Sequence, residues 1–485
     1  MNKIALIILL AHGPCTMAQN VFTIGEVIHR SQSQSPEFKV QETIRENRYW
    51  QYRTYKSNYN PQIRLSGGNA GLLYNNSFSR VLQPDGTVRY LQVNQFNPGI
   101  NLGLEQPIQW TGGVISMNSA YNYFEDYEGN TKQWNGQVFY VRVTQPVFSY
   151  NQYKWDKQIE PIRYEESKRE YAQSMEQIAR DAVDIFFDVL QAQVNQEIAQ
   201  YNLANNDTIY KIEQGRYNIG TTSQDKLLQV ELQLLRSRQD VAKARLDLQT
   251  SSLQLRTYIG MGNGESFDLI MPMDIPDVLV TESEALQHAQ ETRAEYIGFK
   301  RRKIEAESGV AQAKGNRYTI GLAGGFGLNS VGAELNDLYQ DPARQQYVTL
   351  NFDIPLLDWG RRKSMMQQAY ANKRLTDYLI AQQEISFEQE VITKVRQFET
   401  LKLQIEISKK ADEVAFERYN VAQNRYLIGK IDITNLNIAL TEKDDAKRSY
   451  IEALKSFWME YYNLRGLTLY DYVDRKYLYN PFAKE

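Results

Sequence analysis

The chain has 485 residues, and its 55 Lys and Arg nearly balance 58 Asp and Glu, which gives a formal net charge of −3. A nucleic-acid-binding protein normally carries a basic face, so this balance argues against a nucleic-acid partner. The composition includes 33 Tyr and 28 Gly but only three His and one Cys. Few side chains are therefore available for metal or thiol chemistry, and we expect no cofactor.

Residues 1–18 have the features of a secretory signal peptide. Lys3 supplies a positive start, Ile4–Ala11 is a short apolar core, and Ala18 ends a small-residue cleavage site. The apolar core is too short to span a bilayer as a helix. Cys15 invites an alternative, lipid attachment, but Pro14 stands where such a site prefers a small or apolar residue.

No later segment approaches the ~20 apolar residues that a transmembrane helix requires. The exported chain is therefore soluble, or it crosses a membrane as a β-barrel, which is the other structure able to span a bilayer.

An internal duplication organises the mature chain. Glu26–Gly67 aligns without gaps with Glu284–Gly325, an offset of 284 − 26 = 258 residues. Pro146–Gly220 aligns with Pro355–Gly429, an offset of 355 − 146 = 209 residues. The first copy thus carries 258 − 209 = 49 extra residues. We divide the chain into a first repeat (19–259), a linker (260–281), a second repeat (282–469) and a C-terminal tail (470–485).

The first repeat begins with a helix near 26–58 and continues into segments whose apolar residues alternate. Ile100, Leu102 and Leu104, for example, alternate with small or polar neighbours. Segments of about ten such residues are typical of transmembrane barrel strands, although a soluble β-sandwich gives a similar pattern. We predict strands at about 61–73, 97–109, 113–124 and 136–147. Their connections are long (74–96), very short (110–112) and long (125–135), and the 49 extra residues correspond to an additional hairpin at about 97–124.

A long helix follows, from about residue 151 to 217, with Pro161 as its one strong breaker. At 1.5 Å per residue it would extend about 100 Å. Gly220 is well placed to end this helix, and Thr221, Thr222 or Ser223 can cap the helix that returns. The sequence therefore predicts a tight helical tip at 217–223.

The return helix shows heptad spacing that is typical of closely packed helices. One column contains Leu227, Leu234, Val241, Leu248 and Leu255, and its partner column contains Val230, Ser237, Ala244, Ser251 and Tyr258. An ordinary dimeric coiled coil would share this spacing but would leave the glycine-rich alternating segments unexplained.

The second repeat is predicted to contain a helix over 282–315 and two strands, in "TIGLAGGFGLNS" and "YVTLNFDIP", joined through residues 331–344. Its long helix ends at Gly429, and the return helix starts near Asp432 or Thr434. The second helical tip is therefore expected at 426–434.

These features resemble the outer-membrane efflux proteins, the TolC-like channels. The resemblance rests on the duplication, on "QPVFSYNQYK" and "IPLLDWGRRK" at the strand-to-helix junctions, and on "RYNIG" and "RYLIG" at the tips. It implies a mostly α-helical protein with a transmembrane β-barrel portion. The family forms homotrimers in which an outer-membrane barrel, surrounded by lipid, continues into a periplasmic α-helical tunnel. It also implies a passive exit duct served by an inner-membrane pump and a periplasmic adaptor (membrane fusion) protein.

The chain departs from the family in its strand number. Relatives usually contribute four strands per protomer, whereas six are expected here. Three protomers would then close an 18-stranded barrel, a size that leaves an aqueous lumen. Alternatively, the additional hairpin lies outside the barrel wall.

The resemblance also assigns roles to residues near the two tips. The residues expected to dock the adaptor are Arg216, Tyr217, Ile219, Gly220, Arg425, Tyr426, Ile428 and Gly429. The candidate periplasmic gate comprises Asp225, Tyr426, Asp432 and Asn435. Tyr426 matches a tyrosine of the family's closing network, but Ile431 occupies the usual position of its basic partner. Asp225 and Asp432 could form threefold acidic rings, or both could be helix N-caps.

Two other classes of function predict different sequence features. A coiled-coil periplasmic adaptor would have one hairpin per chain and no lipid-facing strands. A structural envelope protein without its own channel is a further alternative. A barrel enzyme would need a nucleophile beside a base, but His29 and His288 lie on predicted helices without a catalytic motif. The protein is therefore expected not to be an enzyme. Multidrug efflux, metal efflux and type I secretion use similar ducts, so the cargo stays open.

Overall fold

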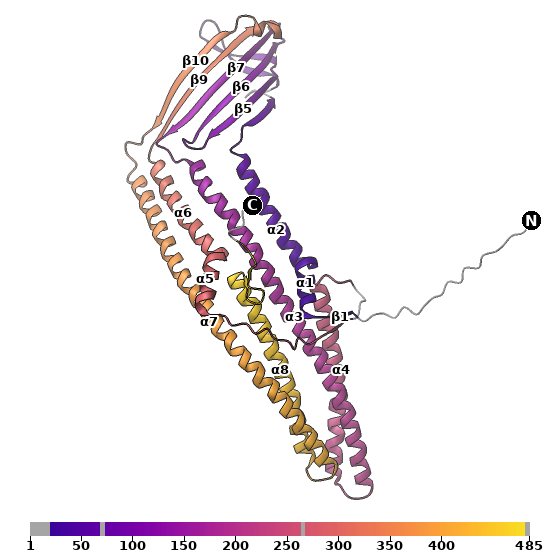
Figure 1. The fold of residues 1–485 in the computed structure, drawn as a ribbon. Coiled ribbons are helices and arrows are strands. Elements are labelled where there is room, and N and C mark those ends of the chain that lie inside the picture. Colours follow the sequence, from indigo (N-terminus) through magenta and orange to yellow (C-terminus); the bar gives the residue numbers. More distant parts are fainter. Residues whose placement is uncertain (1–19, 68–72, 263–266, 481–485) are drawn as a thin grey trace, which may run out of the picture. The chain divides into compact units, whose positions relative to one another are not determined.

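The computed structural model describes residues 20–67, 73–262 and 267–480 (Figure 1). The predicted signal peptide with Cys15, the end of the predicted first strand and part of the glycine-rich link lie outside these residues. None of the helices in the described ranges has the length and apolar content that a membrane-crossing helix needs.

Two compact units make up the fold, and each contains segments from both sequence repeats. Unit 1 comprises the described residues of Met1–Ile44, Arg169–Arg293 and Phe387–Glu485, and it is largely a bundle of helices. Unit 2 comprises Arg45–Lys168 and Ala294–Ser386, and it contains one large sheet with helical segments that continue from its strands.

The helices occur in four pairs whose members have equal or nearly equal lengths. The pairs are α1 (Ile24–Gln34) and α5 (Glu282–Thr292), with 11 residues each; α2 (Pro36–Ser57) and α6 (Ala294–Gly315), with 22; α3 (Gln152–Asn218) and α7 (Arg361–Leu427), with 67; and α4 (Gln224–Tyr258) and α8 (Ile433–Thr468), with 35 and 36. The first two pairs are 258 residues apart and the last two are 209 apart, as in the two sequence alignments.

Each predicted short helix is in fact two helices, so the predictions of single helices over 26–58 and 282–315 are wrong. In the first repeat the chain breaks at Ser35, which has an extended ψ of 152°. Pro36 follows, and proline disfavours the helical conformation in the residue before it. In the second repeat the break falls at Arg293, with ψ of 144°. No proline follows Arg293, so the sequence carries no equally plain signal there.

Six antiparallel strands form the main body of the sheet, in the order β2–β5–β6–β7–β9–β10. They are β2 (Gln62–Gly67), β5 (Gly99–Ile108), β6 (Gly113–Asp126), β7 (Thr131–Val147), β9 (Thr319–Gly332) and β10 (Ala343–Asp353). A short 3₁₀ helix, η1 (Leu335–Tyr339), lies between β9 and β10. The β5–β6 hairpin, which supplies part of the extra residues of the first repeat, pairs with β2 on one side and β7 on the other. The additional hairpin is thus part of the sheet itself (Figure 1).

A further hairpin occupies the segment 74–96, where the sequence analysis expects only a long connection between strands. It consists of β3 (Tyr74–Leu82) and β4 (Val88–Phe96), joined by a turn in which the Gln83 amide donates to Thr87 over 2.7 Å. Only the end of β4 joins the main sheet, where Gln95 and Phe96 pair with β6. The Pro-Asp-Gly sequence at 84–86 is the local signal for this turn.

The two faces of the sheet differ in chemistry, because side chains along a strand alternate between them. On β10, Val348, Leu350 and Phe352 share one face, and all three are exposed in the single chain. On the other face Tyr140 lies over Gly325, where an added Cβ would collide with the phenol oxygen. Glycine is therefore required at position 325 for the ring to lie against the sheet.

The helices of unit 1 pack around an apolar core. Phe186 and Phe187 of α3 are fully buried, and Phe398 of α7 stacks on Phe457 of α8 at a centroid distance of 5.1 Å. On α4 the buried residues are Val230, Leu234, Ser237, Ala244 and Leu255. All five belong to the two heptad columns, which confirms that these columns form the packing face of α4.

Short strands tie the connecting segments to unit 1. β1 (Asn20–Phe22) pairs in parallel with β8 (Phe267–Leu269), which lies within the predicted linker. The predicted tail contains β11 (Tyr470–Asp471) paired with β12 (Lys476–Tyr477). Asp471 is buried there and forms an ion pair with Arg465, which also pairs with Glu176 of α3. The segment after α8 is thus anchored to the helical bundle.

Candidate functional site at the helical tips

Each helical hairpin of unit 1 turns through a glycine in the left-handed conformation. The glycines are Gly220 (φ 74°) after α3 and Gly429 (φ 75°) after α7. Their amides donate to Tyr217 and Tyr426, each over 2.9 Å, and the next amides donate to Arg216 and Arg425, each over 2.8 Å. This is the hydrogen-bond pattern of a helix ended by glycine, because only glycine adopts a positive φ without strain. The two "RY-x-IG" motifs therefore form equivalent turns.

The predicted tip residues nevertheless have different environments. Tyr217 and Ile219 of the first tip are exposed, as are Arg425, Ile428 and Gly429 of the second. Tyr426, which occupies the same motif position as Tyr217, is buried in a cluster with Ile209, Val230, Ile433 and Leu436. The repeated motif thus provides two exposed turns but only one buried tyrosine.

A polar network connects the end of α7 to α3. The Tyr426 hydroxyl donates to Glu213 Oε1 over 2.8 Å, and Arg216 Nη1 lies 2.6 Å from the same oxygen. Arg216 also donates through Nη2 to the Leu427 carbonyl over 2.9 Å. Glu213, Arg216 and Tyr426 therefore form a link between the two hairpins, which we call the tip latch.

The ionisation states within the tip latch favour these bonds. Burial alone would raise the pKa of Glu213, but hydrogen bonds from Tyr426, Arg216 and Thr222 outweigh it, so the net pKa is lowered. Burial and the bond to Glu213 raise the pKa of Tyr426, which keeps the phenol protonated as a donor. The Glu213 carboxylate stabilises the fold at pH values above its unfolded pKa of about 4.3, and this stability is lost as the pH falls through its lower pKa in the folded protein. The tip latch is therefore intact at neutral pH.

A cavity of about 350 Å³ adjoins the tip latch, between the two turns. Its lining includes Glu213, Arg216, Lys226, Tyr426 and Asp432. The cavity therefore brings together charged residues from both hairpins of one chain.

Asp432 has a structural role at the start of α8. It is the N-cap, and its Oδ1 accepts hydrogen bonds from the backbone and side-chain nitrogens of Asn435, each over 2.9 Å. The N-cap of α4 is instead Ser223, while Asp225 lies exposed in the first turn. The suggestion that both acids are N-caps is therefore right for Asp432 and wrong for Asp225, because serine already occupies the capping position.

Glu213 was missed in the sequence analysis. It lies one turn before "RYNIG" and its partner Tyr426 is 213 residues further along the chain. The only local signal is that Glu213 and Arg216 are three residues apart on one helix, a spacing that brings their side chains together. The contact with Tyr426 depends on how the hairpins pack.

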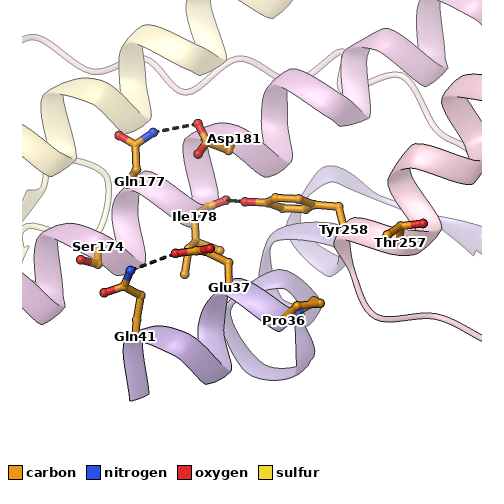
Figure 2. A pocket seen from close by; sticks show the side chains of 9 residues that line it. All are labelled: Pro36, Glu37, Gln41, Ser174, Gln177, Ile178, Asp181, Thr257 and Tyr258. Carbon is orange, nitrogen blue, oxygen red and sulfur yellow. Dashed lines mark hydrogen bonds between the residues drawn. The ribbon is translucent and has the colours of Figure 1, made fainter. Parts of the chain in front are cut away.

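A second cavity of unit 1, of about 370 Å³, lies where α2, α3 and α4 meet (Figure 2). Tyr258 donates to the carbonyl of Ile178 over 3.0 Å beside it, and Gln177 and Gln41 donate to Asp181 and Glu37. No group of three or more metal-ligating side chains was found in the described parts of the chain. The cavity contains none of the residues predicted to form a site.

Comparison with known sequences decides the family. Residues 27–261 and 283–468, which include both hairpins and both strand-to-helix junctions, match the pattern of the outer membrane efflux proteins. The chain belongs to the outer membrane efflux protein family. No curated protein matches this efflux protein closely enough to count as a relative.

Solved structures with a similar fold include outer membrane channels. The outer membrane channel CmeC of Campylobacter jejuni has a TM-score of 0.65 at 13% identity, with 94% of this chain and 87% of that chain covered. The outer-membrane channel OprN has a TM-score of 0.65 at 13% identity, over 92% and 89% of the chains. VceC of Vibrio cholerae has a TM-score of 0.63 at 12% identity, over 92% and 95%. The resemblance of this efflux protein to TolC-like channels is thus confirmed at the level of fold.

Proposed function

We propose that this protein is the outer-membrane exit duct of a tripartite export system. One observation carries the proposal. This chain of the efflux family combines a sheet that has one exposed apolar face with two long helical hairpins. The duct is a passive channel, the helical part lies in the periplasm, and an inner-membrane pump supplies the energy through a periplasmic adaptor.

The working form is a homotrimer. In a single chain β2 and β10 are the outermost strands of the six-stranded path. Unpaired strand edges cannot face lipid, because no water is available there to satisfy their backbone groups. If β2 of each copy pairs with β10 of the next, three copies close an 18-stranded wall, and a barrel of that size has an aqueous lumen. The pairing of the β5–β6 hairpin on both sides supports its inclusion in the wall.

The adaptor docks at the two turns. Ile219 and Ile428 are highly exposed and apolar, and they lie at the same position of the two turns. They are accompanied by Arg216, Tyr217, Gly220, Arg425 and Gly429, and this set is the proposed docking surface. Tyr426, which the sequence also assigns to docking, is buried and is left out of it. Two similar surfaces per chain would present six sites on a trimer.

The tip latch holds the periplasmic end closed. Tyr426, from the predicted gate, acts with Glu213 and Arg216, whereas Asp432 and Asn435 form a cap and Asp225 stays exposed. A threefold ring of Asp225 or Asp432 is the alternative closing element.

Single-channel recording in planar bilayers separates these two gates. Tyr426→Phe removes one hydrogen bond to a carboxylate in each copy, worth about 1.5–3 kcal/mol, so we expect a clear rise in open probability. Asp432→Asn keeps the cap, because Asn and Asp cap equally well, but it removes the charge. It should leave conductance and ion selectivity unchanged. Altered selectivity in Asp432→Asn together with no effect of Tyr426→Phe would favour the acidic ring.

Deletion of the gene tests the proposed function. We expect the mutant to become sensitive to dyes and detergents or to retain polypeptides that the parent secretes, because either cargo would lose its exit. Re-expression of the full chain should restore the parental behaviour. Unchanged sensitivity together with unchanged secretion would count against an exit duct.

A further inference from the structure

The β3–β4 hairpin extends past the strands of the main sheet. In the part of the chain that the structure describes, β4 pairs with β6 only through Gln95 and Phe96, and β3 has β4 as its only strand neighbour. Residues 88–94 of β4 therefore form a two-stranded ribbon with β3, about 23 Å long at the usual rise of a strand. An isolated two-stranded hairpin is marginally stable in water. The ribbon is thus expected to be covered by another molecule.

The two faces of this ribbon differ in composition. One of them, which we call the ribbon face, exposes three aromatic and two aliphatic side chains: Tyr74, Phe78, Leu82, Val88 and Tyr90. Phe78 and Tyr90 are each 73% exposed. Three amides and one arginine share this face: Asn76, Gln92, Asn94 and Arg80. The opposite face consists of Asn75, Ser77, Ser79, Val81, Arg89, Leu91 and Val93, of which Val93 is buried. The aromatic rings of the ribbon therefore all lie on one side.

The ribbon face continues the exposed apolar face of the main sheet. The face to which Val348 belongs crosses β9, β7 and β6 through the paired residues Gly324, Val143 and Ile115. Glu125 lies an even number of residues after Ile115 on β6, so alternation places it on the same face. Glu125 pairs with Phe96, and Phe96 pairs with Tyr74. In the proposed barrel the ribbon face is therefore turned outward, away from the lumen.

A row of aromatic rings crosses this face at the base of the ribbon. Phe96, Tyr123 and Trp134 lie on β4, β6 and β7, with centroid distances of 6.3 Å and 5.0 Å between neighbours. Aromatic rows of this kind occur at the head-group level of membrane barrels. The helices join the strands at the other end, since β2 follows α2 and β7 leads into α3. With the helices in the periplasm, the ribbon lies beyond the head-group level at the cell surface.

This location distinguishes between the possible occupants of the ribbon face. Acyl chains end below the head groups, and the amides and the arginine between the rings would be costly to bury in hydrocarbon. In a closed trimer the three ribbon faces all point outward, so the copies cannot cover one another. The molecules that surround an outer-membrane barrel at this level are the sugar head groups of the outer-leaflet glycolipid.

The side chains of the ribbon face match such a head group. Aromatic rings pack on the C–H faces of sugar rings, and amide side chains both donate to and accept from sugar hydroxyls. Among residues 73–97 the charged side chains are Arg80, Arg89 and Asp85, and Asp85 accepts hydrogen bonds from Thr87 within the turn. Arg80 is thus the charged residue of the ribbon face, and arginine is well suited to bind phosphate.

We propose that the ribbon face binds the phosphorylated oligosaccharide head group of the outer-leaflet glycolipid. Tyr74, Phe78 and Tyr90 stack on sugar rings, and Arg80 pairs with a phosphate. Binding orders a ribbon that has no other strand beside it. The proposal rests on the proposed function, because the outer-membrane location and the closed wall determine where the ribbon face points.

Hydrogen exchange of the full chain in lipid nanodiscs tests the proposal. Discs of phosphatidylethanolamine are compared with discs that also contain lipopolysaccharide, and residues 113–126 serve as the internal reference. A ligand that binds only the ordered ribbon, present at about ten times its Kd, raises protection about tenfold, so exchange over residues 74–96 should slow by about that factor. The deacylated oligosaccharide, added in excess to discs without lipopolysaccharide, should give the same protection, because the head group rather than the acyl chains is recognised.

The two arginines of the ribbon provide a matched pair of variants. Arg80→Gln should reduce the protection that lipopolysaccharide confers, because the phosphate loses its partner. Arg89→Gln makes the same change on the opposite face and should leave this protection at the parental level. Both variants keep every apolar side chain of the ribbon.

The aromatic side chains are tested by a second pair. Phe78→Thr combined with Tyr90→Thr should abolish the protection conferred by lipopolysaccharide, and threonine retains a high preference for strands. Val81→Thr combined with Leu91→Thr is the control on the opposite face. Exchange in discs without lipopolysaccharide shows whether either variant changes the ribbon itself, and Arg80→Gln tests the ribbon face even if the threonine variant loses its strands.

The outcomes separate this proposal from the proposed function. A trimer in both kinds of disc, with a ribbon that is protected by lipopolysaccharide through these side chains, supports the proposal. Equal exchange in both kinds of disc, or protection that survives both the Arg80 and the threonine variants, overturns it while the exit duct stands. Protection found in isolated outer membranes but in neither kind of disc assigns the ribbon face to a protein partner and also overturns it. A chain that enters neither kind of disc overturns this proposal and the proposed function together.

Discussion

Leu235→Asp combined with Leu246→Asp is expected to convert the proposed trimer into folded monomers, because both leucines are exposed on α4 in the single chain and we expect them to be buried between copies. Burying a leucine side chain contributes about 1.5–3 kcal/mol, and an unpaired carboxylate in an apolar contact costs more than the lost burial. Both substitutions occur at every contact of a closed ring, so the loss is repeated three times. Light scattering in detergent at a fixed protein concentration measures the change, and circular dichroism should show that helical content is retained.

The matched control places the same charges elsewhere on α4. Gln229→Asp with Gln254→Asp adds two carboxylates at exposed positions of α4 that lie about 80–120° around the helix from Leu235 and Leu246. This variant should remain trimeric. If the Leu235 and Leu246 variant also stays trimeric, the exposed apolar face of α4 is not part of the contact between copies.

Arg465→Met is expected to destabilise unit 1 strongly. Arg465 forms ion pairs with Glu176 at 2.8 Å and Asp471 at 3.1 Å, and all three side chains are largely buried. Removing one partner of a buried ionic cluster leaves uncompensated charge and costs about 3–5 kcal/mol. Thermal unfolding should shift to lower temperature, and hydrogen exchange should increase over residues 461–477.

A surface pair supplies the control for this variant. Lys476→Met removes the exposed ion pair with Asp474, and exposed pairs contribute about 1 kcal/mol or less, so its unfolding should resemble that of the parent. Similar losses in both variants would contradict a special role for Arg465.

The pH dependence adds a second readout for Arg465. Burial would raise the pKa of Asp471, but Arg465 and hydrogen bonds outweigh this, and the net pKa is lowered. The stability that this carboxylate contributes is present above its unfolded pKa of about 3.9 and is lost as the pH falls through the folded value. The difference between parent and Arg465→Met should therefore shrink below about pH 4.

The regular parts of the fold could be predicted because their signals are local or repeated. Gly220 and Gly429 end the long helices as expected, since a glycine with positive φ is the common helix terminator. The six strands of the main sheet follow from alternation. Pro36 indicates the helix break at Ser35, which the expected single helix did not include. The helix break at Arg293 has no such signal in the sequence.

The candidate site was less predictable because it depends on packing between distant segments. The "RY-x-IG" motif is the same at both tips, yet Tyr217 is exposed and Tyr426 is buried against α3. Local sequence cannot distinguish the two. Likewise Glu213 becomes a partner of Tyr426 only when the hairpins lie side by side. An acid near the start of a helix acts as the N-cap only when it occupies the capping position itself. In α4 that position holds Ser223, and Asp225 lies two residues later.

The matched helix lengths restrict how this protein can change in size. α3 and α7 have 67 residues each, and their return helices have 35 and 36. A seven-residue insertion adds about 10 Å and two turns to a helix. Inserted into a single hairpin, it would leave one turn protruding beyond the other and separate Glu213 from Tyr426. The two turns stay side by side only when all four long helices gain the same number of heptads. Evolution can therefore lengthen the hairpins only by matched insertions in both.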